Sequence, residues 1–546
     1  MRITRRSALA LMGAGASLAV GKAEIDPAIV RRHDDYIDRG LPAQNTDPAS
    51  PWFGGVPNAH GIFNPEPAAG WIEICTAAWL YPGSRFHKTS LLFERIKLAA
   101  GFLTRTQHPD GLVDYLDTNF DSAPDAAFTA WSAATAACLA SRAGERELLA
   151  LIEPFLRKAA AGMATGGIHT PNHRWVVSSA LAQINEIFPD PSYVRRIDQW
   201  LAEGVDLDAD GQFTERSTTV YNPICDRSFL VMALKLKRPE LLAPVRVNLE
   251  SMLYLLHPDF EVVTEISRRQ DQNVRGSMSG YWFPLRYLAI HDANGRFAAL
   301  AARYTDTAAS LSTLMEYPEL LAALPAAVSP PDTYTREMNA LQIVRFRRAA
   351  ESATWLAGQP RFFSIRNGSA VIEGVRFASA FFGKGQFVAP ALEKQDGRYI
   401  LRQRLEAGYY QPLDPPRRVT SANWTELRAK RKQTETCVLN QSAELTQVSA
   451  GYRLRIQASG TDHVPIVIEI NLREGGKLEG CDEILASGYA TYSTPDGSLR
   501  FGPGIGQHRW TQLRGALPKL PGRSVYLTGF SPFDHTLEIV IKEPRA

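Results

Sequence analysis

The hydrophobic pattern of this chain changes once, at Ser329-Pro330-Pro331, and the change constrains the fold more than any other feature. Before it, apolar residues recur at helical spacing between capping and breaking residues. After it, they alternate or run over strand lengths between Gly, Asp and Asn. A chain of 546 residues also exceeds what one hydrophobic core usually supports. We therefore expect a helical domain followed by a β domain.

The first part predicts antiparallel helices joined by loops of alternating length. The expected helices span residues 91–106, 123–141, 147–164, 171–188, 192–203, 223–237, 240–256, 276–291 and 296–315. Longer connections, 107–122, 204–222 and 257–275, take turns with shorter ones. Alternate connections of an up-and-down array lie at one end, so we expect the longer loops to gather beside Asn172 and His173 and to form a cleft.

The second part predicts an antiparallel β-sandwich, because many short strands are separated by turn residues. The clearest strands span residues 362–368, 399–404, 452–456 and 466–470. One further helix over residues 335–348 is expected in the linker. The predicted organisation is a leader (1–23), a helical catalytic domain (24–330), a linker (331–360) and the sandwich (361–546).

The N-terminus is typical of a signal peptide with a twin-arginine-like start, because Arg5-Arg6 precedes a short apolar run that ends in small residues. We expect an exported protein, periplasmic or secreted. No later apolar run reaches about eighteen residues, so no membrane span is predicted. The net charge of +3 gives no nucleic-acid signature. Five cysteines without CxxC spacing argue against a disulfide framework, although a Cys437–Cys481 bridge remains open.

The loop Gly166-Gly167-Ile168-His169 leads into a helix that delivers an amide and an imidazole at its first turn. Thr170 is predicted as the N-cap and Pro171 as the first helical residue. Asn172 and His173 then lie where the helix dipole is positive, which suits a carboxylate and favours a neutral imidazole. The alternative is that Asn172 only helps to cap and that His173 is a core histidine.

Tyr221 precedes a second helix entrance, Asn222-Pro223, where Asn222 is the expected N-cap. An amide, an imidazole and a phenol at one cleft are the groups needed to remove a proton α to a carboxylate and to protonate the leaving oxygen. The pattern therefore indicates β-elimination. The alternative for Tyr221 is a ring packed in the core with a solvated hydroxyl.

Helical repeats before a β-sandwich, Asn172-His173 opening a helix, and the loop from Asp210 through Glu215 to Tyr221 resemble the two-domain polysaccharide lyases of the heparinase II/III and oligoalginate-lyase type. The resemblance implies an incomplete (α/α) toroid, a uronic-acid polysaccharide or oligosaccharide partner, and elimination without a metal or other cofactor. It also implies that Asn172 neutralises the uronate, that His173 assists it or acts as base, and that Tyr221 is the acid, or both acid and base. The β part has only scattered histidines without metal-ligand spacing.

Further candidates for substrate binding lie in the same loops and in the β domain. Arg216, Arg268, Arg269 and Gln270 are expected at the end that carries the cleft, where guanidinium groups suit a carboxylate or sulfate. Charged runs in loops are, however, commonly just solvated. Trp175 is a candidate to stack on a sugar ring and Tyr410 a candidate from the β domain.

Two other functions remain open from the sequence. An inverting glycoside hydrolase on the same helical scaffold could use Asp208, Asp210 and Glu215 as paired carboxylates. A non-catalytic glycan-binding protein could use the same cleft. Elimination, hydrolysis and binding differ in their products, since only elimination gives an unsaturated sugar.

Overall fold

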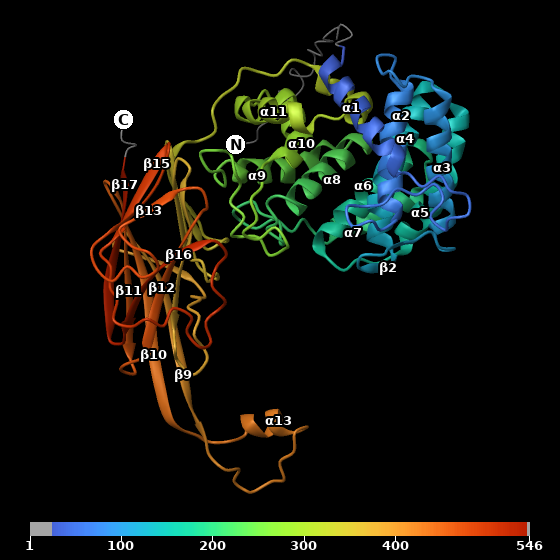
Figure 1. Ribbon diagram of the computed structural model, residues 1–546. Helices are drawn as coiled ribbons and strands as arrows, with labels where there is room; N and C mark the ends of the chain where they lie inside the picture. Colours follow the sequence, from blue (N-terminus) through green and yellow to red (C-terminus); the bar gives the residue numbers. More distant parts are fainter. Residues whose placement is uncertain (1–23, 543–546) are drawn as a thin grey trace, which may run out of the picture. The chain divides into compact units, whose positions relative to one another are not determined.

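A computed structural model describes residues 24–542, so the predicted leader (1–23) lies outside the described residues. The chain forms two compact units (Figure 1). The helical unit comprises the described residues up to Val205, Pro223–Arg246 and Ser279–Ser329. The β unit comprises Asp206–Asn222, Val247–Met278 and the described residues from Pro330 onward. Two of the longer predicted loops, 204–222 and 257–275, thus fall mostly in the β unit.

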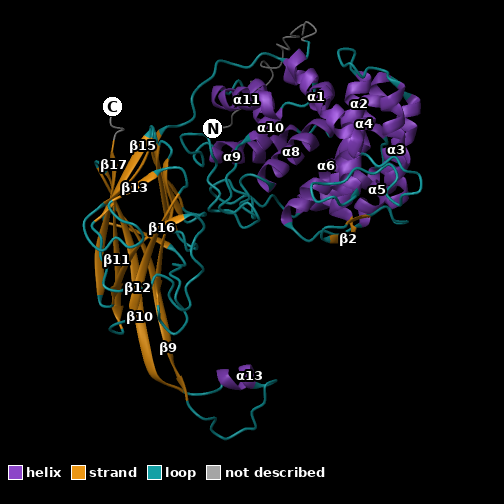
Figure 2. Cartoon of the chain, in the orientation of Figure 1, coloured by secondary structure: helices purple, strands orange, loops and turns teal. Residues whose placement is uncertain are grey.

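Most helices before Pro330 lie close to those predicted, but the first two, Pro27–Gly40 and Pro65–Leu80, were not among the predicted helices (Figure 2). They are α1 (Pro27–Gly40), α2 (Pro65–Leu80), α3 (Ser90–Thr106), α4 (Ala123–Ala143), α5 (Arg146–Thr165), α6 (Pro171–Ile187), α7 (Pro191–Ala202), α8 (Tyr221–Lys235), α9 (Leu242–Met252), α10 (Trp282–His291), α11 (Gly295–Ala308) and α12 (Leu311–Glu316). The largest differences from the predicted boundaries are three. Helix α9 ends at Met252, α10 begins only at Trp282, and Ser310 caps α12 so that the expected helix 296–315 is split.

The helical unit is an incomplete (α/α) toroid in which α2, α4 and α6 pack side by side and α3, α5 and α7 are their hairpin partners. Helix α4 is rich in alanine and is buried on almost every side, because small residues let neighbouring helices approach closely. Helix α7, in contrast, fully buries only Tyr193 and Ile197, and its other residues are half-buried or exposed. The sequence patterns of α4 and α7 therefore correspond to an inner and an outer layer.

The β unit is built on two antiparallel sheets that enclose one apolar core. The eight-stranded sheet has the order β13-β14-β15-β17-β11-β10-β9-β8, and the seven-stranded sheet has the order β16-β12-β7-β6-β5-β4-β3. The strands are β3 (Thr333–Met338), β4 (Ile343–Arg348), β5 (Glu351–Leu356), β6 (Phe363–Asn367), β7 (Ala370–Ser379), β8 (Leu392–Gln395), β9 (Arg398–Tyr410), β10 (Gln433–Val448), β11 (Gly451–Gly460), β12 (Pro465–Leu472), β13 (Lys477–Glu479), β14 (Ala490–Thr494), β15 (Gly497–Gly502), β16 (Arg523–Phe530) and β17 (Phe533–Lys542). The predicted sandwich is confirmed.

The helix predicted over residues 335–348 is wrong, because this segment forms strands β3 and β4. Ile343, Val344 and Phe346 are β-branched or aromatic residues that suit a strand, and pairing with β3 and β5 decides their conformation. The sandwich consequently begins at β3, so no separate linker spans residues 331–360.

Residues 247–278 cover the outer face of the seven-stranded sheet. The hydroxyl of Tyr334 donates to the carbonyl of Tyr254, and Arg345, fully buried, donates to the carbonyls of Tyr254 and Leu256. This cover explains why polar side chains that point away from the core are nevertheless buried.

Between residues 24 and 542, no helix combines the length and the hydropathy needed to cross a membrane. None of the five cysteines, all of which lie in the described residues, is in a disulfide. Cys75, Cys138 and Cys225 are buried, and the bridge considered between Cys437 and Cys481 is not formed.

Candidate active site

Asn172 and His173 lie in the first turn of α6, in the helical unit. Thr170 has extended backbone angles and Pro171 is the first helical residue, as predicted, although the Thr170 side chain does not itself cap the helix. Instead, Asn172 Nδ2 donates to Thr170 Oγ1 at 3.3 Å. Both Asn172 and His173 are more than nine-tenths buried. The helix start therefore holds the amide and the imidazole in place.

Aromatic rings and a pocket surround this helix start. His169 lies edge-on to His173, with ring centroids 4.7 Å apart, and Phe128 contacts the same ring at 6.0 Å. His169 also lines an open pocket of about 400 Å³ between residues 118–124 and 167–169. The loops 107–122 and 165–170 are thus neighbours, as predicted. The sequence pattern alone predicted no role for His169.

Gly111 fixes the loop 107–122 against α5. Its φ of +93° is in the left-handed region, and a Cβ there would lie 1.9 Å from the carbonyl oxygen of Lys158. Only glycine fits this close approach of two backbones. The loop that lines the pocket is therefore held by packing.

Trp175 is not a sugar platform, because its side chain is completely buried. Its ring packs against Phe229 of α8, with ring centroids 4.7 Å apart. The guanidinium of Arg174 lies 4.4 Å from the centroid of the same tryptophan ring. Trp175 and Phe229 lie in the second and third turns of their helices. The tryptophan therefore joins α6 to α8 instead of contacting a substrate.

Tyr221 belongs to the β unit and is the first residue of α8. The helix starts earlier than predicted, and Asn222 is not its N-cap. Asn222 is fully buried and donates to Gln212 Oε1 at 2.7 Å. The backbone N–H of Tyr221 is instead satisfied by Ser217 Oγ at 3.1 Å.

Asp271 is the hub that fixes Ser217 and hence Tyr221. Its buried carboxylate accepts hydrogen bonds from Ser217 Oγ at 2.9 Å and from both the N–H and the hydroxyl of Thr219 at 3.1 and 3.0 Å. Ser267 Oγ donates to the same carboxylate. A carboxylate with several donors is strongly held. Sequence analysis missed this role, because nothing in the sequence pairs Asp271 with residues 54 positions away.

The phenol oxygen of Tyr221 is approached by two donors from the neighbouring loop. Arg269 Nη2 lies 3.4 Å and Gln270 Nε2 lies 3.3 Å from it, and the Arg269 guanidinium stacks 4.8 Å from the ring centroid. Arg269 also pairs with the buried Glu215 at 3.7 Å. These donors would stabilise negative charge on the phenol oxygen.

The other predicted arginines are placed differently. The side chain of Arg268 is exposed. Its backbone N–H donates to the Glu215 carbonyl at 3.1 Å and so joins loop 257–275 to loop 204–222. Arg216 points to the Ala340 carbonyl, 2.7 Å away, and lies 3.7 Å from Asp208. Burial lowers the pKa of Arg216. The guanidinium at Tyr221 is therefore that of Arg269, and Arg216 serves as an anchor within the β unit.

The carboxylates considered for hydrolysis are occupied by structural contacts. Asp208 accepts the N–H groups of Asp210 and Gln212 at 3.0 Å, and Asp210 accepts the N–H of Leu341 at 3.0 Å. Glu215 is paired with Arg269. These contacts are typical of turn formation, so the geometry does not favour an acid and base pair there.

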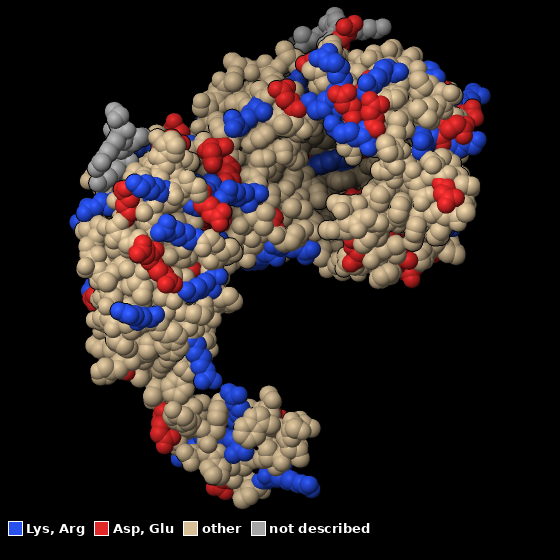
Figure 3. Space-filling model, viewed as in Figure 1, with Lys and Arg blue, Asp and Glu red and all other residues tan. Residues whose placement is uncertain are grey.

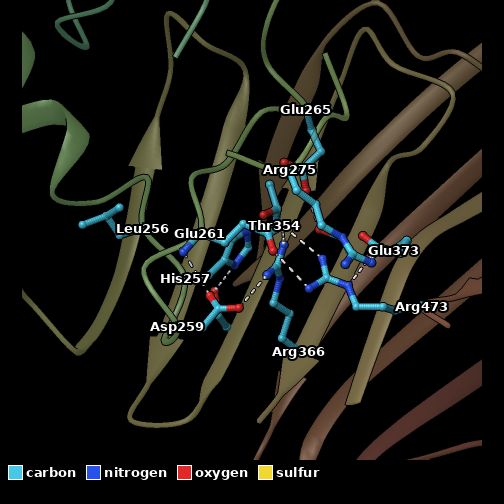
Figure 4. A network of polar contacts seen from close by, with 12 residues as sticks. Leu256, His257, Asp259, Glu261, Glu265, Arg275, Thr354, Arg366, Glu373 and Arg473 are labelled. Carbon is cyan, nitrogen blue, oxygen red and sulfur yellow. Dashed lines mark hydrogen bonds and ion pairs between the residues drawn. The ribbon is translucent and has the colours of Figure 1, made fainter. Parts of the chain in front are cut away.

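An ionic network anchors the loop that carries Arg269 and Gln270 to the seven-stranded sheet (Figure 4). Glu261 accepts from Arg366 at 2.6 Å and from Arg473 at 3.0 Å, and Arg473 also bonds Glu373 at 2.5 Å. Although burial opposes ionisation, the two guanidinium groups lower the pKa of Glu261 to about 2. A neighbouring contact joins His257 Nδ1 to Ser352 Oγ at 3.0 Å, and burial lowers the pKa of His257 well below its ordinary value.

Comparisons with known proteins bear on the fold. No family model matches the sequence, and no curated protein matches it. Among solved structures, chondroitin AC lyase of Streptomyces coelicolor A3 is similar with a TM-score of 0.58 and 13% identity, over 98% of this chain and 81% of that one. Paenibacillus xanthan lyase follows with a TM-score of 0.57 and 10% identity, over 95% of this chain and 57% of that one. A second chondroitinase AC lyase gives a TM-score of 0.53 and 9% identity, over 96% and 84%.

The chain has the fold of these polysaccharide lyases. Identities of this size establish the architecture alone. The predicted combination of toroid and sandwich is confirmed, whereas the heparinase II/III-like or oligoalginate-lyase-like type stays a prediction. Asn172 and His173 belong to the helical unit, and Tyr221, Arg269 and Gln270 belong to the β unit.

Proposed function

We propose that this protein cleaves acidic polysaccharides by β-elimination at a uronic acid. The observation that carries the proposal is the Tyr221 phenol, whose oxygen receives Arg269 and Gln270 as donors in a chain with a polysaccharide-lyase fold. A phenol oxygen that accepts two hydrogen bonds still has one hydrogen to donate. That hydrogen is suited to the leaving glycosidic oxygen.

In the proposed reaction the substrate loses the proton from C5, the bond from C4 to the glycosidic oxygen breaks, and a C4–C5 double bond forms. Asn172 donates to the uronate carboxylate and so stabilises the negative charge that spreads onto it when the proton leaves. His173 assists this binding or takes the C5 proton. Tyr221 gives a proton to the departing oxygen, or performs both transfers.

Arg269 and Gln270 are proposed to donate hydrogen bonds to the Tyr221 phenol oxygen, in addition to any contact with the substrate. If Tyr221 passes through the phenolate, both donors stabilise it without reorganisation, since Asp271 and Ser217 already hold the two loops together. The guanidinium of Arg269 would do so more strongly, because charged donors make stronger hydrogen bonds.

The arginine pair and apolar run of the predicted leader support export to the periplasm or beyond as part of the proposal. Substrates of this kind are large polyanions, which an exported enzyme can reach.

The test is to incubate the purified protein with alginate, glucuronan, chondroitin sulfate and xanthan while ultraviolet absorbance is followed. Elimination gives a double bond conjugated to the carboxylate and hence an absorbance rise together with new reducing ends. Reducing ends without absorbance would identify a hydrolase and overturn the proposal. Absence of both from the whole panel, while the polymers are bound, would favour the glycan-binding alternative.

A further inference from the structure

Strands β9 and β10 continue past the rest of their sheet and carry an excursion at their tip, residues 411–432, which we call the finger (Figure 1). Strand β8 pairs with β9 only up to Leu401, and β11 pairs with β10 only from Leu439. In the described chain, residues 407–410 and 433–437 therefore form a ribbon of two strands without a third. Isolated two-stranded ribbons are marginally stable, so the extension adds little to the fold.

The finger concentrates positive charge. It contains six basic residues, Arg417, Arg418, Arg428, Lys430, Arg431 and Lys432, against Asp414 and Glu426. Its net charge of +4 exceeds the +3 of the whole chain. Figure 3 shows Lys and Arg side chains over this part of the β unit. Among the described residues, Lys430 alone of the six is in an ion pair, with Glu426. Arg431 donates to the Gln411 carbonyl at 3.1 Å. The exposed side chains of Arg417, Arg418, Arg428 and Lys432 are in no ion pair within the part of the chain that the structure describes and can meet an anionic partner.

Aromatic rings lie beside these charges. The exposed fraction is 47% for Trp424, 40% for Tyr410 and 61% for Tyr409. The Arg428 guanidinium lies 4.9 Å from the Tyr410 ring centroid, and that of Arg431 lies 5.2 Å from the Trp424 centroid. Cation–π contacts orient the guanidinium groups while the rings keep surface open to solvent. An exposed ring stacks on a sugar face, and a neighbouring guanidinium binds a carboxylate or sulfate bidentately.

We propose that the finger is a second binding site for an anionic polysaccharide chain, formed by residues outside the candidate active site. This inference rests on the proposed function for the class of glycan. Such a chain carries sugar rings and acidic groups, and the finger offers an aromatic ring beside a guanidinium group at two places. Tyr410, predicted from the sequence as a substrate contact, would contact glycan here.

A long polymer then binds at two places on one protein molecule, which raises its apparent affinity over that of a short oligosaccharide. The finger therefore favours long chains, whereas short fragments depend on the active-site residues alone.

The first experiment measures how strongly the parent protein and its variants are retarded in native gels that contain alginate or chondroitin sulfate. A gel that contains neutral dextran is the control for retardation without charge. The test variant replaces residues 411–432 by Asn-Gly, a two-residue turn suited to join Tyr410 and Gln433, which already pair across the ladder. A charge-matched comparison sets Arg417→Gln/Arg418→Gln against Arg402→Gln/Arg404→Gln on β9. Trp424→Ala tests stacking. All variants carry Tyr221→Phe, so that the polymer is not consumed.

The shortened variant should bind the polyanions about tenfold more weakly, which corresponds to about 1.4 kcal/mol. Substituting Arg417 and Arg418 should lower the affinity for the polyanion more than substituting Arg402 and Arg404. The difference should become smaller at high salt, because salt screens the charges. Equal affinity of the shortened and parent proteins, or an equal loss from the β9 pair, overturns the inference. Tighter retention by single-stranded DNA than by either glycan also overturns it.

The second experiment uses Tyr221 intact and compares turnover of polymer with turnover of a short oligosaccharide from the same polymer. Removing the finger should lower polymer turnover at low concentration about tenfold and leave the oligosaccharide rate unchanged. If no unsaturated product forms while the finger still retards the protein, the proposed function fails and the finger site stands. If product forms and the finger makes no difference to binding or turnover, the finger inference alone fails.

Discussion

The phenol oxygen of Tyr221 lies 3.4 Å from Nη2 of Arg269, and the same guanidinium stacks 4.8 Å from the tyrosine ring centroid. One arginine thus contacts both the face and the hydroxyl of the proposed proton donor. The pair forms between loops that Asp271 connects, so its geometry depends on contacts outside either side chain.

Tyr221→Phe should lower elimination roughly a hundred- to ten-thousandfold, because it removes the proton-transfer group while it keeps the ring. The melting temperature should change little, since one lost hydrogen bond costs on the order of 1 kcal/mol. The elimination rate is measured as turnover of the preferred polymer, and the melting temperature is measured by thermal unfolding. Tyr334→Phe, which removes a hydroxyl bonded to the Tyr254 carbonyl in the same unit, is the matched control and should retain full turnover. A Tyr221 variant with more than about a tenth of wild-type turnover would exclude tyrosine as the proton donor.

Asn172→Ala should lower turnover on uronates by on the order of a hundredfold or more, because a preorganised donor to the carboxylate is lost. Asn185, near the other end of α6, accepts a hydrogen bond from the N–H of Asp190 at 3.1 Å. Asn185→Ala is therefore the control for a general effect on this helix. Equal small losses from both variants would assign Asn172 to helix stability.

Asp271→Asn should lower kcat more than it changes KM, because the carboxylate positions Tyr221 through Ser217 without contacting the substrate itself. The amide cannot accept from all the donors that now converge on it, so unfolding should become easier by about 1–3 kcal/mol. Asp259→Asn, a half-exposed carboxylate in the same loop that pairs with Arg366, is the comparison. An equal fall in kcat for Asp271→Asn and Asp259→Asn would show that Asp271 has no specific positioning role.

Acid should destabilise the β unit through Glu261. Its pKa is lowered from 4.5 to about 2 in the folded protein, so the carboxylate contributes stability above about pH 4.5 that is lost as the pH falls toward about 2. The loss is at most on the order of 3 kcal/mol. Glu261→Gln should be less stable near neutral pH, and its free energy of unfolding should fall less between pH 4.5 and 2. Parallel pH profiles from chemical denaturation would contradict the role given to the Arg366 and Arg473 contacts.

Local patterns determined much of this protein. The small-residue sequence of α4 and the Thr170-Pro171 start of α6 specify their own helices, because capping and helical periodicity act over a few residues. The same holds for the strand patterns after Pro330 and therefore for the toroid followed by a sandwich. Asn172 and His173 could also be placed in the first helical turn from the sequence.

Tertiary contacts decided the rest. Residues 335–348 became strands because β5 and the cover formed by residues 247–278 offered pairing and burial that helix propensity does not describe. Trp175 is buried against Phe229 of α8 and so cannot stack on a sugar, and Arg216 donates to the Ala340 carbonyl. The junction of Asp271, Ser217 and Tyr221 joins segments about fifty residues apart. Such pairings depend on the three-dimensional path of the chain, and periodicity within a short window carries no information about them.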